Sequence, residues 1–103
     1  MGLFDFLKTD DISAALEARE ENSVLLDVRE EDEYNRGHIP GAVNYPLSSL
    51  DRAKLPWDKN IPLYVYCLAG TRSRKAVSFL QSKGYEYVKN IGGINSYRGS
   101  LEK

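Results

Sequence analysis

Two short apolar segments place the strongest constraint on how this chain of 103 residues folds. Residues 24–28 (VLLDV) and 63–66 (LYVY) are almost continuously apolar rather than alternating, which is typical of parallel strands covered by helices on both faces. Segments with helical features lie before and after them. Because strands that alternate with helices form parallel sheets with right-handed crossovers, the pattern predicts an α/β fold.

The expected helices begin and end at ordinary signals. Thr9 begins a helix that runs to about Arg19, with carboxylates near its positive end. The acidic residues 30–36 form a short helical segment that ends at Gly37. A third helix begins at Ser73 and ends at Gly84. Two further strands are predicted at residues 42–44 and 87–91.

Composition excludes several classes of protein. Fourteen basic and fifteen acidic residues give a formal charge of -1, which supplies no broad field for nucleic acid or an anionic membrane. One cysteine excludes an intramolecular disulfide and favours a reducing cytosol. The sequence has no secretory signal pattern and no run of eighteen apolar residues, so neither export by such a signal nor membrane spanning is expected. We expect a single domain over residues 1–103.

Cys67 lies where ligand sites form in α/β proteins, between the carboxyl end of a predicted strand and a helix. Backbone N–H groups of such a turn converge on one point and favour an anion there. They would lower the pKa of a thiol and raise its thiolate fraction at neutral pH. From Lys59 to Tyr85 the chain carries five basic and no acidic residues, and Arg72 is placed to bind an oxyanion.

Three collinear blocks resemble one family. The loop CLAGTRS, from Cys67 to Ser73, is similar to the active-site loop of the rhodanese family of sulfurtransferases. The block LLDVREEDEYNRGHIPGAVNYPL resembles the family's upstream signature, with matches at residues 27–29, 33–34 and 37–42. Residues 87–94 (YVKNIGGI) resemble its last strand and Gly-Gly turn. The resemblance implies a rhodanese-like fold, a small twisted parallel sheet of four to five strands with helices on both faces.

The resemblance implies sulfur transfer. The Cys67 thiolate would take the outer sulfur of a donor as a persulfide and pass it to an acceptor. The implied loop is Leu68, Ala69, Gly70, Thr71 and Arg72, in which Arg72 and the amides hold the donor's anionic end and Gly70 permits the tight turn. Ser73 would begin the next helix and cap it. No metal or organic cofactor is implied.

The sequence does not specify the sulfur donor or the sulfur acceptor. Thiosulfate, polysulfide or a protein persulfide are expected as donors, and cyanide, glutathione, thioredoxin or another thiol as acceptors. Leu68 stands where many thiosulfate-using members carry Arg, which weakens the case for thiosulfate. A relay or protein-docking module with little turnover of small molecules is the alternative. A phosphatase or arsenate reductase is less favoured, because those relatives have five residues between Cys and Arg, and this loop has four. A monomer is compatible with the sequence.

Supporting roles fall to residues outside the loop. Asp27 and Arg29 could suggest acid/base chemistry, but Asp27 interrupts an apolar strand, and a buried carboxylate needs a cation or backbone donors. A structural ion pair or a hydrogen-bond network is therefore expected. His38, the only imidazole, is expected to order the Gly-His-Ile-Pro-Gly turn rather than to deprotonate Cys67. Gly92 and Gly93 are expected in a turn with positive φ. An edge strand around residues 3–6 is expected to be short or lost. Ser73 and Arg74 complete the supporting set.

Overall fold

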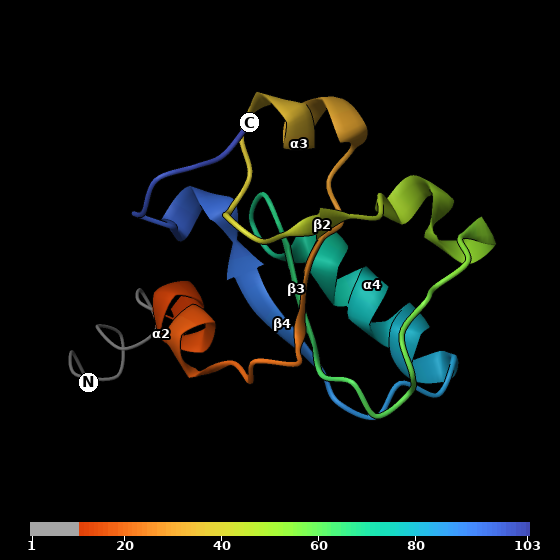
Figure 1. The fold of residues 1–103 in the computed structure, drawn as a ribbon. Coiled ribbons are helices and arrows are strands. Elements are labelled where there is room, and N and C mark those ends of the chain that lie inside the picture. The colour runs from red at the N-terminus through yellow and green to blue at the C-terminus, as the bar shows by residue number, and fades with distance from the viewer. Residues whose placement is uncertain (1–10) are drawn as a thin grey trace, which may run out of the picture.

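The computed structural model describes residues 11–103 and contains a four-stranded parallel sheet in the order β2-β1-β3-β4 (Figure 1). The strands are β1 (Val24–Asp27), β2 (Val43–Asn44), β3 (Leu63–Cys67) and β4 (Val88–Gly93). All three pairings are parallel, and β1 lies inside the sheet between β2 and β3. The predicted α/β class and parallel sheet are confirmed. The expected start of the first helix and the edge strand at residues 3–6 lie outside the described residues.

Helices cover both faces of the sheet. Figure 1 shows α2 (Asp11–Ala18) on one side and α4 (Thr71–Ser82) on the other. The short α3 (Glu31–Arg36) lies beyond the carboxyl ends of the strands, at the top of the view. Two 3-10 turns, η1 (Leu47–Arg52) and η2 (Ile94–Ser96), complete the described elements.

Side chains of β1 and β3 alternate between two apolar clusters, as strand geometry requires. The cluster on the α4 side contains Leu26, Val65 and Cys67, together with side chains from η1 and α4. The cluster on the α2 side contains Leu25 and Tyr66. Both faces of these strands are therefore buried, which explains why they read as continuous apolar runs rather than as alternating ones.

Several element boundaries differ from the prediction by one or two residues, and two of them have a clear physical reason. The helix expected from Ser73 begins at Thr71, because Gly70 adopts a left-handed conformation (φ 99°) and its carbonyl accepts the N–H of Arg74. Ser73 therefore lies inside the first turn, and its hydroxyl does not cap the helix. The last strand continues to Gly93, because a bulge between the pairs of Val65 and Tyr66 inserts one extra residue in β4.

A buried ion pair fixes the end of β1. Asp27 is fully buried, and both of its carboxylate oxygens accept hydrogen bonds from the Arg29 guanidinium, the shortest at 2.7 Å. Arg29 also donates to the Gly37 carbonyl at 2.8 Å, where the chain leaves α3. Asp27 thus has the expected structural role, with Arg29 as its cation, and the pair links the sheet to the segment after α3.

Arg29→Met tests this link. The change leaves the Asp27 carboxylate buried without its cation, so we expect the free energy of unfolding to fall by about 3–5 kcal/mol in urea denaturation at neutral pH. Arg36→Met is the matched control, because the Arg36–Asp32 pair is about 70% exposed on both sides and such pairs contribute less than about 1 kcal/mol. Equal losses in the two variants would contradict a special role for the buried pair.

Candidate active site

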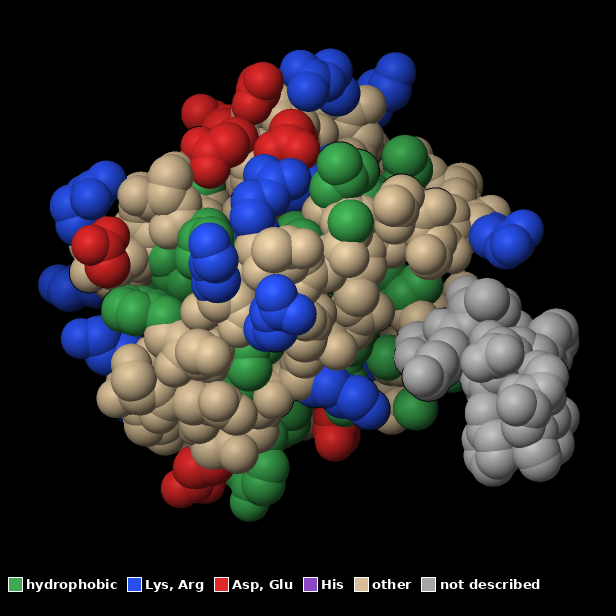
Figure 2. Space-filling model, turned by 180° about the vertical axis from the view of Figure 1, so that it is seen from behind, with side chains coloured by type: hydrophobic (Ala, Val, Ile, Leu, Met, Phe, Trp, Pro, Cys, Tyr) green, Lys and Arg blue, Asp and Glu red, His purple; other side chains and the backbone are tan. Residues whose placement is uncertain are grey.

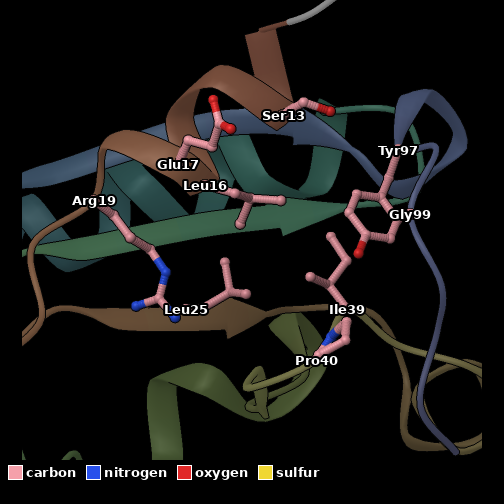
Figure 3. Close-up of a pocket in the computed structure, with 9 residues that line it drawn as sticks. All are labelled: Ser13, Leu16, Glu17, Arg19, Leu25, Ile39, Pro40, Tyr97 and Gly99. Carbon is pink, nitrogen blue, oxygen red and sulfur yellow. The ribbon is translucent and has the colours of Figure 1, made fainter.

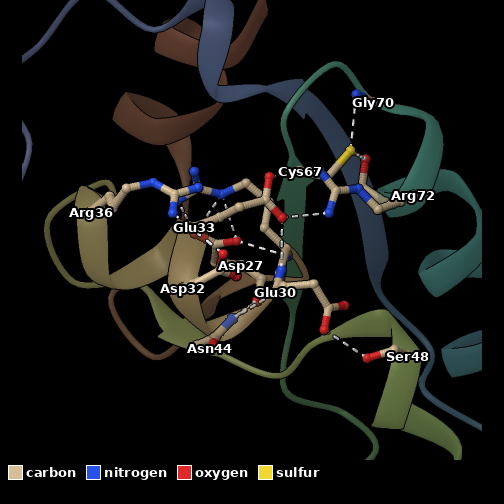
Figure 4. Close-up of polar contacts among 12 residues, drawn as sticks. Asp27, Glu30, Asp32, Glu33, Arg36, Asn44, Ser48, Cys67, Gly70 and Arg72 are labelled. Carbon is tan, nitrogen blue, oxygen red and sulfur yellow. Dashed lines mark hydrogen bonds and ion pairs between the residues drawn. The ribbon is translucent and has the colours of Figure 1, made fainter.

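Cys67 ends β3 and lies at the base of a tight loop that leads into α4. Its side chain is only 1% exposed. The Gly70 backbone N–H donates a hydrogen bond to the Cys67 Sγ at 3.0 Å, and the Ser73 Oγ lies 3.4 Å from the same sulfur (Figure 4). The sulfur is therefore surrounded by hydrogen-bonding groups of its own loop and of the first turn of α4.

These contacts decide the acidity of the thiol. Burial raises the pKa of the Cys67 thiol, because it disfavours the charged form. Hydrogen bonds from the Ser73 hydroxyl and from backbone N–H groups favour the thiolate and outweigh burial, so the pKa lies below its ordinary value. The N–H groups belong to Ala69, Gly70 and Ser73. The arrangement is suited to a nucleophilic sulfur.

Asn90, on β4, joins the groups that surround the sulfur. Its Oδ1 accepts hydrogen bonds from the Ser73 hydroxyl at 2.8 Å and from the Gly92 N–H at 2.9 Å. Its Nδ2 donates to the Gly70 carbonyl at 3.1 Å. Ser73 has one hydroxyl hydrogen, which serves Asn90 or the thiolate but not both at once. Sequence reasoning missed Asn90, because its partners lie twenty and seventeen residues away in the chain.

Two glycines of β4 let the loop approach the sheet. Gly92 has a φ of 104°, as the turn prediction requires. Gly93 is extended (φ -125°), so the expectation of positive φ is wrong for this residue. Its constraint is space: a Cβ at Gly93 would collide with the Leu68 carbonyl and the Ala69 backbone. The loop therefore rests on the sheet at Gly93, which limits where it can place the sulfur.

Arg72 is paired with a residue of α3. Its two terminal nitrogens donate to the two carboxylate oxygens of Glu33 at 2.7 and 3.0 Å. Figure 4 shows the guanidinium between Cys67 and the Glu33 carboxylate. The prediction that positive charge gathers around the thiol is therefore incomplete, because folding brings acidic α3 to the same place. On the face seen in Figure 2, acidic and basic side chains lie next to one another.

Glu33 has a second set of contacts within α3. Its Oε1 also accepts the Glu30 backbone N–H at 3.0 Å in a capping box. The hydrogen bonds from Arg72 are the main reason that the pKa of Glu33 falls to about 2, and the charge of Arg29 adds to this. Glu33 belongs to the matching upstream block but received no site role from the sequence. The signal available in the sequence was an acidic segment, residues 30–36, and a separate basic segment, residues 59–85. Such a pattern does not specify which opposite charges pair.

The other predicted site residues divide into two groups. Leu68 and Ala69 are exposed on the loop, with 47% of Leu68 accessible, and Thr71 and Arg74 are exposed on the first turn of α4. His38 contacts other groups: its Nδ1 lies 2.9 Å from the Tyr34 carbonyl oxygen, and its ring stacks on Tyr34. Its Nε2 lies 3.9 Å from a Glu102 carboxylate oxygen. These contacts agree with the expected structural role of His38.

A separate hollow of about 430 Å³ lies on the other face of the sheet (Figure 3). Its lining includes Leu16 of α2, Leu25 and Ile39. Leu25 and Ile39 belong to the cluster on the α2 side, whereas Cys67 belongs to the cluster on the α4 side. The hollow is therefore not part of the thiol site.

Comparison with known protein families identifies the family of the domain. The model of the rhodanese-like domain matches residues 10–100. The chain belongs to the rhodanese-like domain family. A rhodanese-like domain protein from Staphylococcus aureus has a similar structure, with a TM-score of 0.75 and 30% identity over 91% of this chain and 92% of that one.

Several curated relatives carry names from sulfur chemistry. The thiosulfate sulfurtransferase PspE of Escherichia coli is 39% identical over 67% of this chain and 68% of its own length. A tRNA sulfurtransferase of Desulfurococcus amylolyticus is 39% identical over 80% of this chain but only 16% of its own length. The chain likewise spans 45% of YrkF and 63% of YqhL from Bacillus subtilis. Several relatives are thus longer proteins that contain a similar domain.

Two general features concern the residues that the structure describes. In residues 11–103, no group of three or more His, Cys, Asp or Glu side chains is arranged to hold a metal ion. No helix in this range combines the length and apolar character needed to cross a membrane.

Ser73→Ala tests the hydrogen bonds at the sulfur. The variant lacks the hydroxyl that favours the thiolate, so the pKa of Cys67 should rise. We expect the iodoacetamide alkylation profile to move to higher pH, with a rate at neutral pH lower by about three- to tenfold. Ser82→Ala, at the far end of α4, should leave the profile unchanged. An unshifted Ser73→Ala profile would show that the backbone N–H groups suffice.

The Arg72–Glu33 pair predicts a pH dependence of stability. Glu33 has a pKa of about 2 in the folded state and an ordinary value of 4.5. The folded state is therefore favoured above pH 4.5, and this contribution is lost as pH falls from about 4.5 towards 2. We expect wild type to lose more stability than Glu33→Gln between pH 6 and pH 3 in urea denaturation. Parallel losses would contradict the depressed pKa.

Proposed function

We propose that this chain is a rhodanese-type sulfurtransferase in which Cys67 carries sulfane sulfur as a persulfide. The observation that carries the proposal is the setting of the sulfur at the end of β3. The Gly70 N–H donates to the Cys67 Sγ at 3.0 Å, and hydrogen bonds lower the thiol pKa despite burial. Membership of the rhodanese-like family and relatives named sulfurtransferases support the same chemistry.

The first half-reaction loads the sulfur. The Cys67 thiolate attacks the outer sulfur of the donor and forms a new S–S bond. The bond between that sulfur and the rest of the donor breaks, and the leaving group takes the electron pair: sulfite from thiosulfate, or a thiolate from a hydropersulfide. Backbone N–H groups of the loop stabilise the negative sulfur throughout, as an oxyanion hole stabilises oxygen. Neither oxidant nor reductant is consumed.

The second half-reaction transfers the sulfur to an acceptor. An acceptor thiolate or cyanide attacks the outer sulfur of the persulfide, and the bond to Cys67 breaks. Cys67 regains its electron pair as a thiolate, so the cycle is a ping-pong reaction. Because the chain has one cysteine, no second thiol of this chain can resolve the persulfide. The acceptor must come from outside the chain.

A second candidate is a sulfur-relay module with little turnover of small molecules. It is favoured by the lengths of the relatives, since similar domains form 16% of a tRNA sulfurtransferase and 21% of an adenylyltransferase and sulfurtransferase. In such a module the donor and acceptor would be proteins, and the same Cys67 persulfide would form.

Intact-mass spectrometry under non-reducing conditions tests the persulfide. After incubation with thiosulfate or an alkyl hydropersulfide, we expect the protein mass to rise by one sulfur atom. Treatment with cyanide should remove the atom and release thiocyanate. Cys67→Ser should gain no sulfur, and its circular dichroism should match wild type because serine fills the same place.

Three outcomes separate the candidates. Sulfur loading with rapid cyanide-dependent turnover supports the sulfurtransferase. Loading from a protein persulfide with negligible turnover of small donors supports the relay. A wild-type protein that gains no sulfur from any donor contradicts both proposals, and hydrolysis of an aryl phosphate that is lost in Cys67→Ser would then assign a phosphatase.

A further inference from the structure

We propose that Glu33 determines which donors the site accepts, because it occupies the one loop guanidinium that a doubly charged donor would need. The inference rests on the proposed sulfurtransferase function and concerns its donor class. It assigns a preference for hydropersulfide donors over thiosulfate. Glu33 acts through Arg72 and is therefore a specificity-determining residue without contact to the reacting sulfur.

Glu33 occupies the terminal edge of the Arg72 guanidinium. Both terminal nitrogens of the guanidinium are used by the two carboxylate oxygens of Glu33. This two-point, end-on pairing is one of the arrangements in which Arg also binds a sulfonate or phosphate. The side chains of Arg72 and Glu33 are 32% and 21% exposed. A donor that bound the same edge of the guanidinium would therefore have to displace a partly buried carboxylate.

The charges around the pair hold Glu33 in place. Its carboxylate is ionised at neutral pH and faces two cations, Arg72 and Arg29. Arg72 in turn faces Glu33, Glu30 and the sulfur of Cys67. Opposite charges therefore alternate along this line, and the Arg72–Glu33 unit carries no net charge. Near the thiol, the loop therefore presents backbone N–H groups that can bind a sulfur donor by hydrogen bonds, rather than a free cation.

The two donor classes place different demands on such a site. Thiosulfate binds with two negative charges and leaves as sulfite, which keeps both of them. An alkyl hydropersulfide leaves as a thiolate with one negative charge. A site whose cation is already neutralised penalises the first donor more than the second. The exposed apolar side chain of Leu68, 47% accessible on the same loop, adds no charge for a sulfonate.

Glu33→Gln is the informative variant. Glutamine retains the Oε1 that accepts the Glu30 N–H, and a capping box is formed by Gln as well as by Glu. It removes the charge that holds Arg72. Glu30→Gln is the matched control: Glu30 lies on the same segment and acts on Arg72 through its charge, yet its Oε1 accepts a hydrogen bond from Ser48 rather than from Arg72.

We expect Glu33→Gln to lower the KM for thiosulfate by about three- to tenfold, the effect of one partly exposed charge-assisted hydrogen bond. The KM for the hydropersulfide of 2-mercaptoethanol should change by less than about twofold. Glu30→Gln should leave both values near wild type. In a second measurement, sulfate, which cannot transfer sulfur, should protect Cys67 from iodoacetamide at lower concentrations in Glu33→Gln than in wild type.

The results separate this inference from the proposed function. If wild type loads sulfur but Glu33→Gln gains neither thiosulfate affinity nor sulfate protection, the role of Glu33 is wrong and the sulfurtransferase stands. An equal gain in Glu30→Gln also overturns the inference, because any loss of negative charge near Arg72 would then favour thiosulfate. If no donor loads wild type, the donor preference falls with the proposed function. Should Glu33→Gln fold poorly, Glu33→Asp, too short for the same two-point pairing, must shift sulfate protection in the same direction.

Discussion

The buried pair of Asp27 and Arg29 is the interaction on which the rest of the site depends. A buried carboxylate at the end of a central strand needs a compensating charge, and the Arg29 guanidinium supplies it at 2.7 Å. The same guanidinium holds the Gly37 carbonyl at 2.8 Å and so fixes the segment that leaves α3. Asn44 of β2 also stabilises this end of β1, because its side-chain amide donates hydrogen bonds to the carbonyls of Asp27 and Arg29. The position of α3, and with it the side chain of Glu33, follows from these contacts.

Charged groups of alternating sign lie between the Asp27–Arg29 pair and the thiol. Arg29 lowers the pKa of Glu33 by its charge, Glu33 holds Arg72 through two hydrogen bonds, and Arg72 faces Cys67. Each group is stabilised by the next, so no single one is a free charge available to a substrate. The arrangement connects scaffold and chemistry, because a group that orders α3 also decides how much of the Arg72 charge a donor can use.

The sulfur itself is held mainly by the backbone. Gly70 turns the chain so that N–H groups point inward, Gly93 allows the loop to lie against the sheet, and Asn90 fixes Gly70 and Ser73 from β4. Backbone donors are fixed by the fold and require no reorganisation when negative charge develops on sulfur. This suits the proposed alternation of the sulfur between thiolate and persulfide, and it fits a loop whose own side chains are largely exposed.

The sequence by itself determined the α/β class and the place of Cys67 at the end of a strand, because both follow from local apolar runs. The family was indicated by three short motifs that resemble its members. Helix and strand ends shifted by a few residues, since Gly70 and the β4 bulge respond to contacts across the sheet. Only the tertiary structure decided that Arg72 is bound to Glu33, thirty-nine residues earlier, and that Asn90 holds the loop. Both pairings join segments that approach only after the strands assemble, and charge patterns along a chain do not specify which opposite charges will meet.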